Sequence, residues 1–153
     1  IQNSLTSFTH QRLKLARQGQ NPTVISRMEA DWAVIVDVHM LNGYCLLLPD
    51  PVGVSLNDLG LREREVFLRD MSILGDAILE ATGAARINYE ILGNSEAALH
   101  AHIIPRYAAE PDQFRTGPVW FYDFSKAPRL NLENPAHQAL KAKLEAALKA
   151  HLA

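Results

Sequence analysis

The sequence predicts an α+β fold in which helices pack on an antiparallel sheet. Three features point to it. Two strand-like segments, Trp32–Met40 and Tyr44–Leu48, stand on either side of a turn signal and predict a hairpin. A long amphipathic helix follows over Arg62–Thr82. Two further strands are expected after it, over Arg86–Leu92 and Leu99–Ile104, and a C-terminal helix completes the pattern.

The first elements are a helix and two strands. Loose helical spacing of apolar residues predicts a helix over Leu5–Arg17, which the turn-forming stretch Gly19–Pro22 ends. Val24–Ser26 is a candidate short strand. Trp32–Met40 is rich in β-branched residues, which favour strands. Asn42-Gly43 follows, and both residue types tolerate the positive φ of a two-residue hairpin turn.

The middle of the chain holds the clearest helix. Tyr44–Leu48 is apolar throughout, as in a strand buried on both faces, and Pro49 is expected to end it. Arg62–Thr82 carries apolar residues close to i, i+3, i+4 spacing, with charge on the other side. Gly83 stands where a left-handed C-cap is expected.

The remaining elements are two strands and a final helix. Arg86–Leu92 and Leu99–Ile104 are predicted strands, and Pro105 is expected to close the second. The stretch Pro111–Leu132 has no regular pattern, and a final helix is predicted to start near Asn134, followed by a proline at its favoured first position. We expect a single domain over residues 1–153, with a core of about 24–107 and a C-terminal extension of about 108–153.

Composition narrows the class of protein. Apolar residues make up 48% and charged residues 21% of the 153 residues, as in a soluble globular protein. The formal net charge of -2 gives no basic field for a nucleic-acid partner. Cys45 is the one cysteine, so no intrachain disulfide can form, and without a signal-like segment a cytoplasmic location is expected. The apolar runs are too short for a membrane span, so no membrane partner is expected.

The segment that carries chemistry surrounds two histidines. Side chains alternate between the faces of a strand, so His100 and His102 share one face while Leu99 and Ile103 point toward the core. The loop Gly93-Asn94-Ser95 precedes them and offers amides and a hydroxyl. Together these groups can bind an anion.

Two other interpretations compete with the anion site. One is that His100 and His102 are surface or hydrogen-bonded histidines without a function. The other is a zinc pair, which needs further ligands. The candidates for those ligands are Cys45, His39 and Glu90, but no spacing nominates them, so we predict no metal site.

Beyond the pattern itself, Leu99-His-Ala-His-Ile-Ile-Pro-Arg106 resembles the signature of the histidine triad (HIT) superfamily of nucleotide hydrolases and transferases, in which three histidines alternate with apolar residues. The resemblance covers roughly residues 31–107, because the hairpin, the long helix and the two later strands follow the order of the family. Gly93-Asn94-Ser95 matches the phosphate loop of the family at the same distance before the middle histidine.

The resemblance implies a role for each matching residue. His100 takes the place of the middle histidine, which attacks the α-phosphate and forms a covalent nucleotidyl-histidine. His102 would donate a hydrogen bond to a phosphate oxygen, and Ser95, Asn94 and Gly93 would assist it.

Further matching residues contact the rest of the nucleotide in the family. Asp37 corresponds to the residue that binds the ribose hydroxyls, and Asn88 corresponds to an asparagine near the phosphates. Arg106 could also reach a phosphate, although a solvated arginine is more common.

Two positions depart from the family pattern. Ala98 stands in place of the first histidine, although its backbone carbonyl can still orient the nucleophile. Tyr44 replaces a histidine often found after the hairpin turn. The first departure puts turnover in doubt more than binding.

The resemblance therefore implies an enzyme that cleaves the α-phosphate bond of a dinucleoside polyphosphate or a nucleoside phosphoramidate. A non-catalytic nucleotide-binding protein is the leading alternative, and a metal-dependent hydrolase is the third. No cofactor is expected beyond Mg²⁺ bound to a polyphosphate substrate, and the family implies a homodimer.

Overall fold

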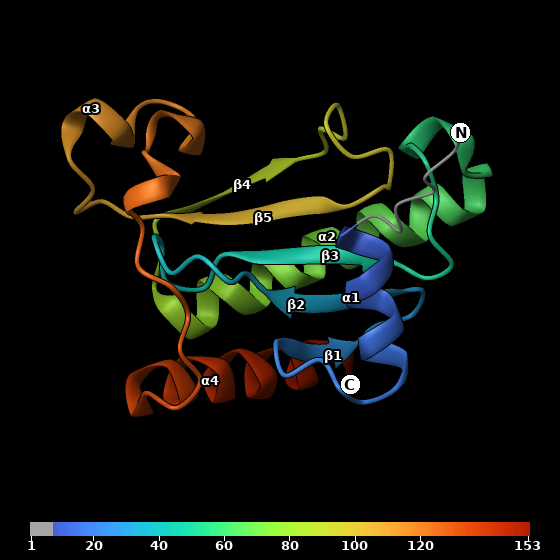
Figure 1. Cartoon of the computed structure of the whole chain (residues 1–153), viewed down its shortest axis with the longest axis horizontal. Coiled ribbons are helices and arrows are strands. Elements are labelled where there is room, and N and C mark those ends of the chain that lie inside the picture. The colour runs from blue at the N-terminus through green and yellow to red at the C-terminus, as the bar shows by residue number, and fades with distance from the viewer. Residues whose placement is uncertain (1–7) are drawn as a thin grey trace, which may run out of the picture.

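Five antiparallel strands form a single sheet within residues 8–153, the part of the chain that the computed structural model describes. Their order across the sheet is β1-β2-β3-β5-β4 (Figure 1). The strands are β1 (Val24–Arg27), β2 (Asp31–Ile35), β3 (Cys45–Pro49), β4 (Arg86–Glu90) and β5 (Ala101–Arg106). The crossover between β3 and β4 carries the long helix, so β5 returns to lie between them.

Helices cover both faces of this sheet. The helices are α1 (Phe8–Arg17), α2 (Leu61–Thr82), α3 (Asp112–Arg115) and α4 (Pro135–Leu152). The long helices α2 and α4 pack against each other on one face, whereas α1 lies across the other face (Figure 1). The predicted α+β class is confirmed, with a long helix between the strand pairs and a C-terminal helix. In residues 8–153, none of the helices has the length and apolar character that crossing a membrane requires.

The alternation of side chains along the strands divides the core in two. Ala33 and Ile35 of β2 face α2 and α4, whereas Val34 faces the α1 side. All of β3 is buried, as its apolar sequence predicts for a strand covered on both faces. The α1 side of the core receives Leu13 from α1, which is 1% exposed.

The helix ends follow the sequence signals. Gly83 takes the left-handed conformation at the end of α2 with φ +68°, a conformation that glycine adopts without the strain of a Cβ. The side chain of Asn134 accepts a hydrogen bond from the Ala136 N–H and so caps α4. Of the expected helix over residues 5–17, residues 5–7 lie outside the described residues and the remainder is α1.

The predicted hairpin is confirmed, since β2 and β3 pair antiparallel, but its two-residue turn is wrong. Strand β2 ends at Ile35, and residues 36–44 form a longer connection to β3 in place of the turn expected at 42–43. Within that connection, the backbone at 37–39 pairs with residues 128–130: the Leu130 N–H donates to the Asp37 carbonyl and the His39 N–H donates to the Pro128 carbonyl. A segment distant in sequence thus takes the hydrogen bonds that a continued hairpin would have used.

The second pair of strands also differs from the prediction in its bounds. Strand β4 ends at Glu90, and β5 begins at Ala101 and contains Pro105, which was expected to close it. The pairing of β3 with β5 starts at Cys45, which lies opposite Ile103, so no residue of β3 pairs with Pro105. A proline, which lacks a backbone N–H, is therefore tolerated at this position of β5. The connection over residues 91–100 leads directly into β5 and carries the candidate site.

Candidate functional site

The two histidines of the motif meet at the start of β5. His100 is the last residue of the connecting loop, and His102 is the second residue of β5, between Leu46 of β3 and Glu90 of β4. Their ring centroids are 5.0 Å apart at an interplanar angle of 66°. The alternation argument thus places the two imidazoles correctly, even though β5 starts later than predicted.

His100 is held by the backbone of the loop. Its Nδ1 lies 2.8 Å from the carbonyl oxygen of Ala98. A carbonyl can only accept, so Nδ1 carries the proton and Nε2 presents a bare lone pair. This tautomer is the one that an imidazole nucleophile needs.

His102 is oriented by Tyr44, which lies two residues before Leu46 on the neighbouring β3 side. The Tyr44 hydroxyl and His102 Nδ1 are 2.5 Å apart. Tyr44 is 4% exposed and burial raises its pKa, so it stays a phenol and donates to Nδ1. Burial most of all, and then the charges of His100 and Arg12, lower the pKa of His102 to about 4. A neutral His102 with an occupied Nδ1 carries its remaining proton on Nε2, where it can be donated to an anion.

The aromatic ring of Trp120 closes one side of His102. Its ring centroid is 5.3 Å from that of His102, at an angle of 88°. The Trp120 indole N–H donates to the Glu90 carboxylate, which fixes the indole against the sheet. The irregular segment after β5 therefore contributes to the site.

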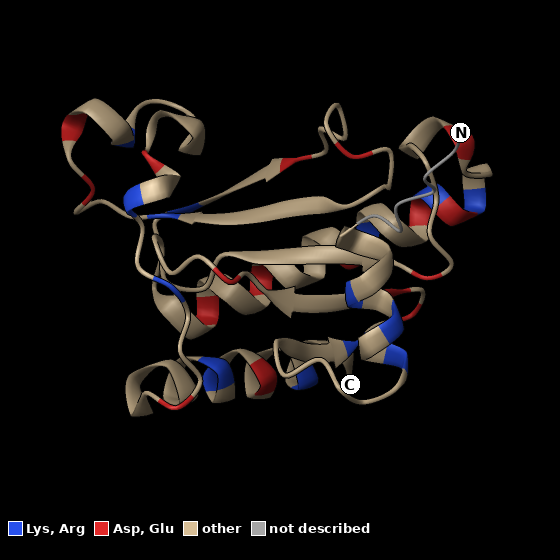
Figure 2. Ribbon diagram, in the orientation of Figure 1, with Lys and Arg blue, Asp and Glu red and all other residues tan. Residues whose placement is uncertain are grey.

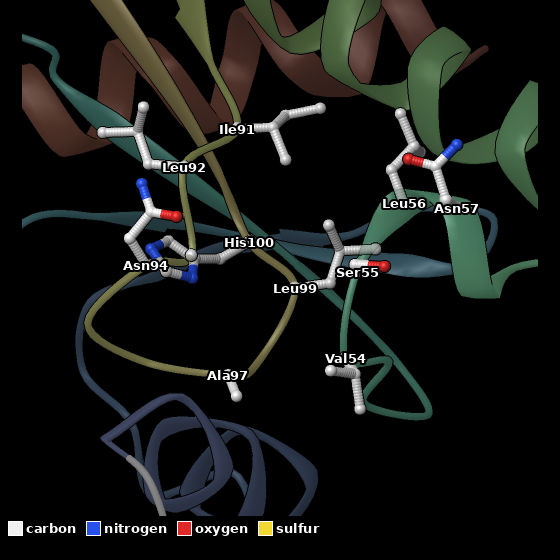
Figure 3. A pocket seen from close by; sticks show the side chains of 11 residues that line it. Val54, Ser55, Leu56, Asn57, Ile91, Leu92, Asn94, Ala97, Leu99 and His100 are labelled. Atoms are coloured by element: carbon white, nitrogen blue, oxygen red, sulfur yellow. The ribbon is translucent and has the colours of Figure 1, made fainter.

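A cavity of about 390 Å³ opens beside His100. Figure 3 shows His100 and Asn94 on one wall and the segment before α2, with Ser55 and Asn57, on the other. Polar lining comes from these side chains, and Ile91 and Leu92 are among the apolar residues that complete it.

The predicted site residues divide between this cavity and its surroundings. His100, Asn94 and Gly93 line the cavity. Ser95 is exposed in the same loop but is not part of the lining. His102 is not part of the lining either; it lies beside His100 and is hydrogen-bonded to the Tyr44 hydroxyl.

Asp37 lies on a different part of the site, in the connection after β2. Its carboxylate accepts a hydrogen bond from Arg12 of α1 at 2.6 Å, and the Asp37 side chain is 45% exposed. Arg12 belongs to a helix that the sequence predicts only from loose periodicity, without any indication of a role in the site.

Asn88 and Arg106, both considered as phosphate contacts, bind each other. The Arg106 guanidinium donates to the Asn88 side-chain oxygen at 2.9 Å and forms a buried ion pair with Glu110. Arg106 also donates to the carbonyl oxygens of Phe114 and Gly117. Both residues line a groove beside β4 and α3, separate from the cavity at His100. The expected contacts of Asn88 and Arg106 with phosphate are not supported by this arrangement, because each side chain serves the packing of the segment after β5.

Of the candidate zinc ligands, Glu90 lies opposite His102 on β4, where its carboxylate accepts from Trp120. Cys45 is fully buried in the core, and the His39 ring lies against that of His137, with centroids 4.0 Å apart and planes tilted by 38°. In the described part of the chain, no group of three or more His, Cys, Asp or Glu side chains is placed to hold a metal ion.

Three residues of the site were not assigned a role from the sequence. Tyr44 was recognised only as a departure from the family pattern, Trp120 belongs to an aromatic cluster in an irregular segment, and Arg12 had no signal. Tyr44 could have been found from its position, because it replaces a histidine of the family.

Solved structures of histidine triad proteins share this fold. The chain is similar to a histidine triad protein from Marinobacter aquaeolei VT8, with a TM-score of 0.69 and 24% identity over 90% of this chain and 96% of that chain. A histidine triad protein from Sinorhizobium meliloti 1021 has a TM-score of 0.67 and 22% identity over 84% of this chain and 91% of that chain. A zinc-bound histidine triad family protein from Mycobacterium smegmatis has a TM-score of 0.63 and 18% identity over 90% of this chain and 93% of that chain.

No protein-family model matches the sequence, and no curated protein matches it. At identities of this level, the likeness to solved structures establishes the fold. The chain therefore has the histidine triad fold.

Proposed function

We propose that this protein binds a nucleotide and cleaves the bond between its α-phosphate and a leaving group, with His100 as the nucleophile. The observation that carries the proposal is the contact between His100 Nδ1 and the Ala98 carbonyl, which leaves Nε2 bare at the edge of the cavity. The substrates are dinucleoside polyphosphates or nucleoside phosphoramidates.

The reaction proceeds in two steps. His100 Nε2 attacks the α-phosphorus, a nitrogen–phosphorus bond forms, and the bond to the leaving group breaks. The proton on Nδ1 stays with the imidazole, and the Ala98 carbonyl stabilises the positive ring. Water then attacks the phosphorus, and the electrons of the nitrogen–phosphorus bond return to Nε2, which releases the nucleoside monophosphate and restores neutral His100. The proton that the water loses balances the proton that the leaving group takes up from solvent as it departs.

His102 and the loop stabilise the charge that develops on phosphorus. The Tyr44 hydroxyl keeps His102 as an Nε2–H donor. Because the His102 ring lies next to that of His100, this donor is close to a phosphorus atom that His100 attacks. Ser95 and Asn94 add a hydroxyl and an amide from the same loop, and Gly93 lets the loop turn with φ +76°. Asp37 binds the ribose hydroxyls through the part of its carboxylate that is exposed.

The proposed protein works as a homodimer in the cytoplasm and needs no cofactor of its own. Mg²⁺ enters only when a polyphosphate substrate carries it. Light scattering of the purified protein over a concentration series measures the oligomeric state.

Rapid acid quench with an adenylate donor, followed by peptide mass spectrometry, tests the mechanism. We expect an adenylyl group on the peptide that contains His100. The His100→Ala variant should lose both the adduct and turnover, whereas His151→Ala, a histidine on α4 paired with Glu80, is the matched control and should keep both. Ser95→Ala should slow adduct formation by roughly 10²-fold if Ser95 acts like a single oxyanion donor.

The same experiment separates the alternatives. Wild-type turnover in His100→Ala would refute the nucleophile and favour water activated by a base. Nucleotide binding without turnover or adduct would refute the enzyme and leave a nucleotide-binding protein, the alternative that the missing imidazole at Ala98 motivates.

A further inference from the structure

We propose that Arg12, on the N-terminal helix α1, binds the phosphate of the substrate. This inference rests on the proposed function, since it adds a cation from outside the histidine motif to the same site. It is carried by the placement of α1, by the contacts that fix Arg12 and by the charge around the two histidines.

Helix α1 is attached to the loop that carries His100. The backbone N–H of Thr9, in the first turn of α1, donates to the Glu96 carboxylate at 2.7 Å. Figure 3 shows the helix beneath the loop next to Ala97. One turn further along α1, Leu13 is buried among the apolar residues of the sheet face that carries Tyr44. The helix is therefore held against both the loop and the sheet.

The side chain of Arg12 is fixed in place by two contacts. Its guanidinium carbon lies 4.0 Å from the centre of the Phe8 ring, and one of its terminal nitrogens donates to Asp37 at 2.6 Å. Only 14% of the side chain is exposed. A guanidinium carries five N–H donors in a planar fork, and the bond to Asp37 uses one of them. A held guanidinium with further donors can bind an oxyanion with little loss of side-chain entropy.

The charge of Arg12 acts on the site. Burial is the main cause of the pKa shifts of His102 and Tyr44, and the positive charge of Arg12 lowers the pKa of both. Helix α1 packs on the sheet face that carries Tyr44, and Arg12 reaches Asp37 from there. Arg106, the other arginine considered as a phosphate ligand, forms an ion pair with Glu110 and lines the separate groove beside β4 and α3.

A cation is needed here because the histidines do not supply one. Burial keeps His102 neutral at physiological pH, and His100 must be neutral to attack. A substrate phosphate brings at least one negative charge into this site. Figure 2 shows basic positions along α1, which crosses the sheet, and Arg12 is the one of them that contacts Asp37, the proposed ribose ligand. Ribose at Asp37 and phosphate at Arg12 are neighbouring parts of one nucleotide.

Calorimetric titration with three probes tests this assignment. The probes are AMP, adenosine and inorganic pyrophosphate, and the proteins are the wild type, Arg12→Gln, Arg12→Lys and the control Lys14→Gln. Lys14 is exposed on the same helix, so its substitution removes the same charge without touching the site. We expect Arg12→Gln to weaken AMP and pyrophosphate by roughly ten- to a hundredfold, the loss of one or two charge-assisted hydrogen bonds, and to leave adenosine unchanged. Arg12→Lys should recover part of the loss for both anions.

Each other outcome has a defined meaning. Equal weakening of AMP and adenosine would overturn the inference, because Arg12 would then serve to hold Asp37 or to stack on the base. Unchanged AMP and pyrophosphate affinities in Arg12→Gln would also overturn it, while leaving the proposed function intact. A wild-type protein that binds pyrophosphate through Arg12 but binds no nucleotide would support the anion site and contradict the proposed function.

Discussion

Replacing Tyr44 by phenylalanine isolates the hydrogen bond that orients His102. The substitution removes one oxygen atom and leaves the ring in its buried position, 4% exposed. His102 Nδ1 loses the donor that lies 2.5 Å away and becomes a partly buried acceptor without that partner. The cost of such a group is about 1–3 kcal/mol.

Most of this cost should appear in kcat. If His102 donates to charge that develops at phosphorus, a misoriented imidazole weakens the transition state more than the bound substrate, and kcat should fall by roughly ten- to a hundredfold with little change in KM. The pKa of His102 should also rise from about 4, because the Tyr44 hydroxyl binds the lone pair that protonation would use. The acid limb of the pH–rate profile should therefore move to higher pH.

Two measurements check these expectations. Steady-state hydrolysis of a nucleoside phosphoramidate gives kcat and KM, and nitrogen NMR of the imidazoles gives the tautomer and titration of His102 without any substrate. Tyr89→Phe, on β4 where its ring packs against Gly75 of α2, is the matched control. Wild-type kcat together with an unchanged His102 titration would refute the orienting role of Tyr44.

Two further predictions concern stability. Burial most of all, and then the neighbouring carboxyl of Asp70, raise the pKa of Asp31 well above its ordinary value of 3.8. The folded protein thus keeps a proton that the unfolded chain releases, so the stability that this group contributes is fully present below pH 3.8 and is lost as the pH rises through the raised pKa. Asp31→Asn should flatten this fall in urea unfolding, whereas Asp112→Asn should not. Parallel curves for wild type and Asp31→Asn would contradict the assignment. Arg106→Gln should cost about 3–5 kcal/mol because it leaves Glu110 buried without its cation, and the double variant with Glu110→Gln should recover part of the loss in the same assay.

The histidine pair could be predicted because side-chain alternation does not depend on strand bounds. His100 and His102 are two residues apart, and any extended backbone places them on one side. The error of two residues at the start of β5 therefore did not affect them. The caps at Gly83 and Asn134 were predictable for a related reason, since each depends on a local backbone preference.

The contacts of Asp37, Asn88 and Arg12 could not be predicted, because they depend on segments far apart in sequence. Asp37 was expected within a strand, but the chain leaves the sheet after Ile35 and pairs with residues 128–130, which lie about ninety positions later. Asn88 has the residue type of a phosphate ligand, yet its side-chain oxygen accepts a hydrogen bond from the buried Arg106. Arg12 reaches the site only because α1 folds back across the sheet. No local pattern reports contacts of this kind.

The residue at position 98 illustrates how the site divides its work between backbone and side chain. Ala98 is 0% exposed, so its methyl group is packed away from solvent. The carbonyl of the same residue still accepts from His100 at 2.8 Å, and every residue type carries that carbonyl. Under the proposed function, an alanine at this position supplies no side-chain donor or proton carrier, while its carbonyl still orients His100. Under the proposed function, the missing polar group is offset from outside the motif, by Arg12 for charge and by Tyr44 for the orientation of His102.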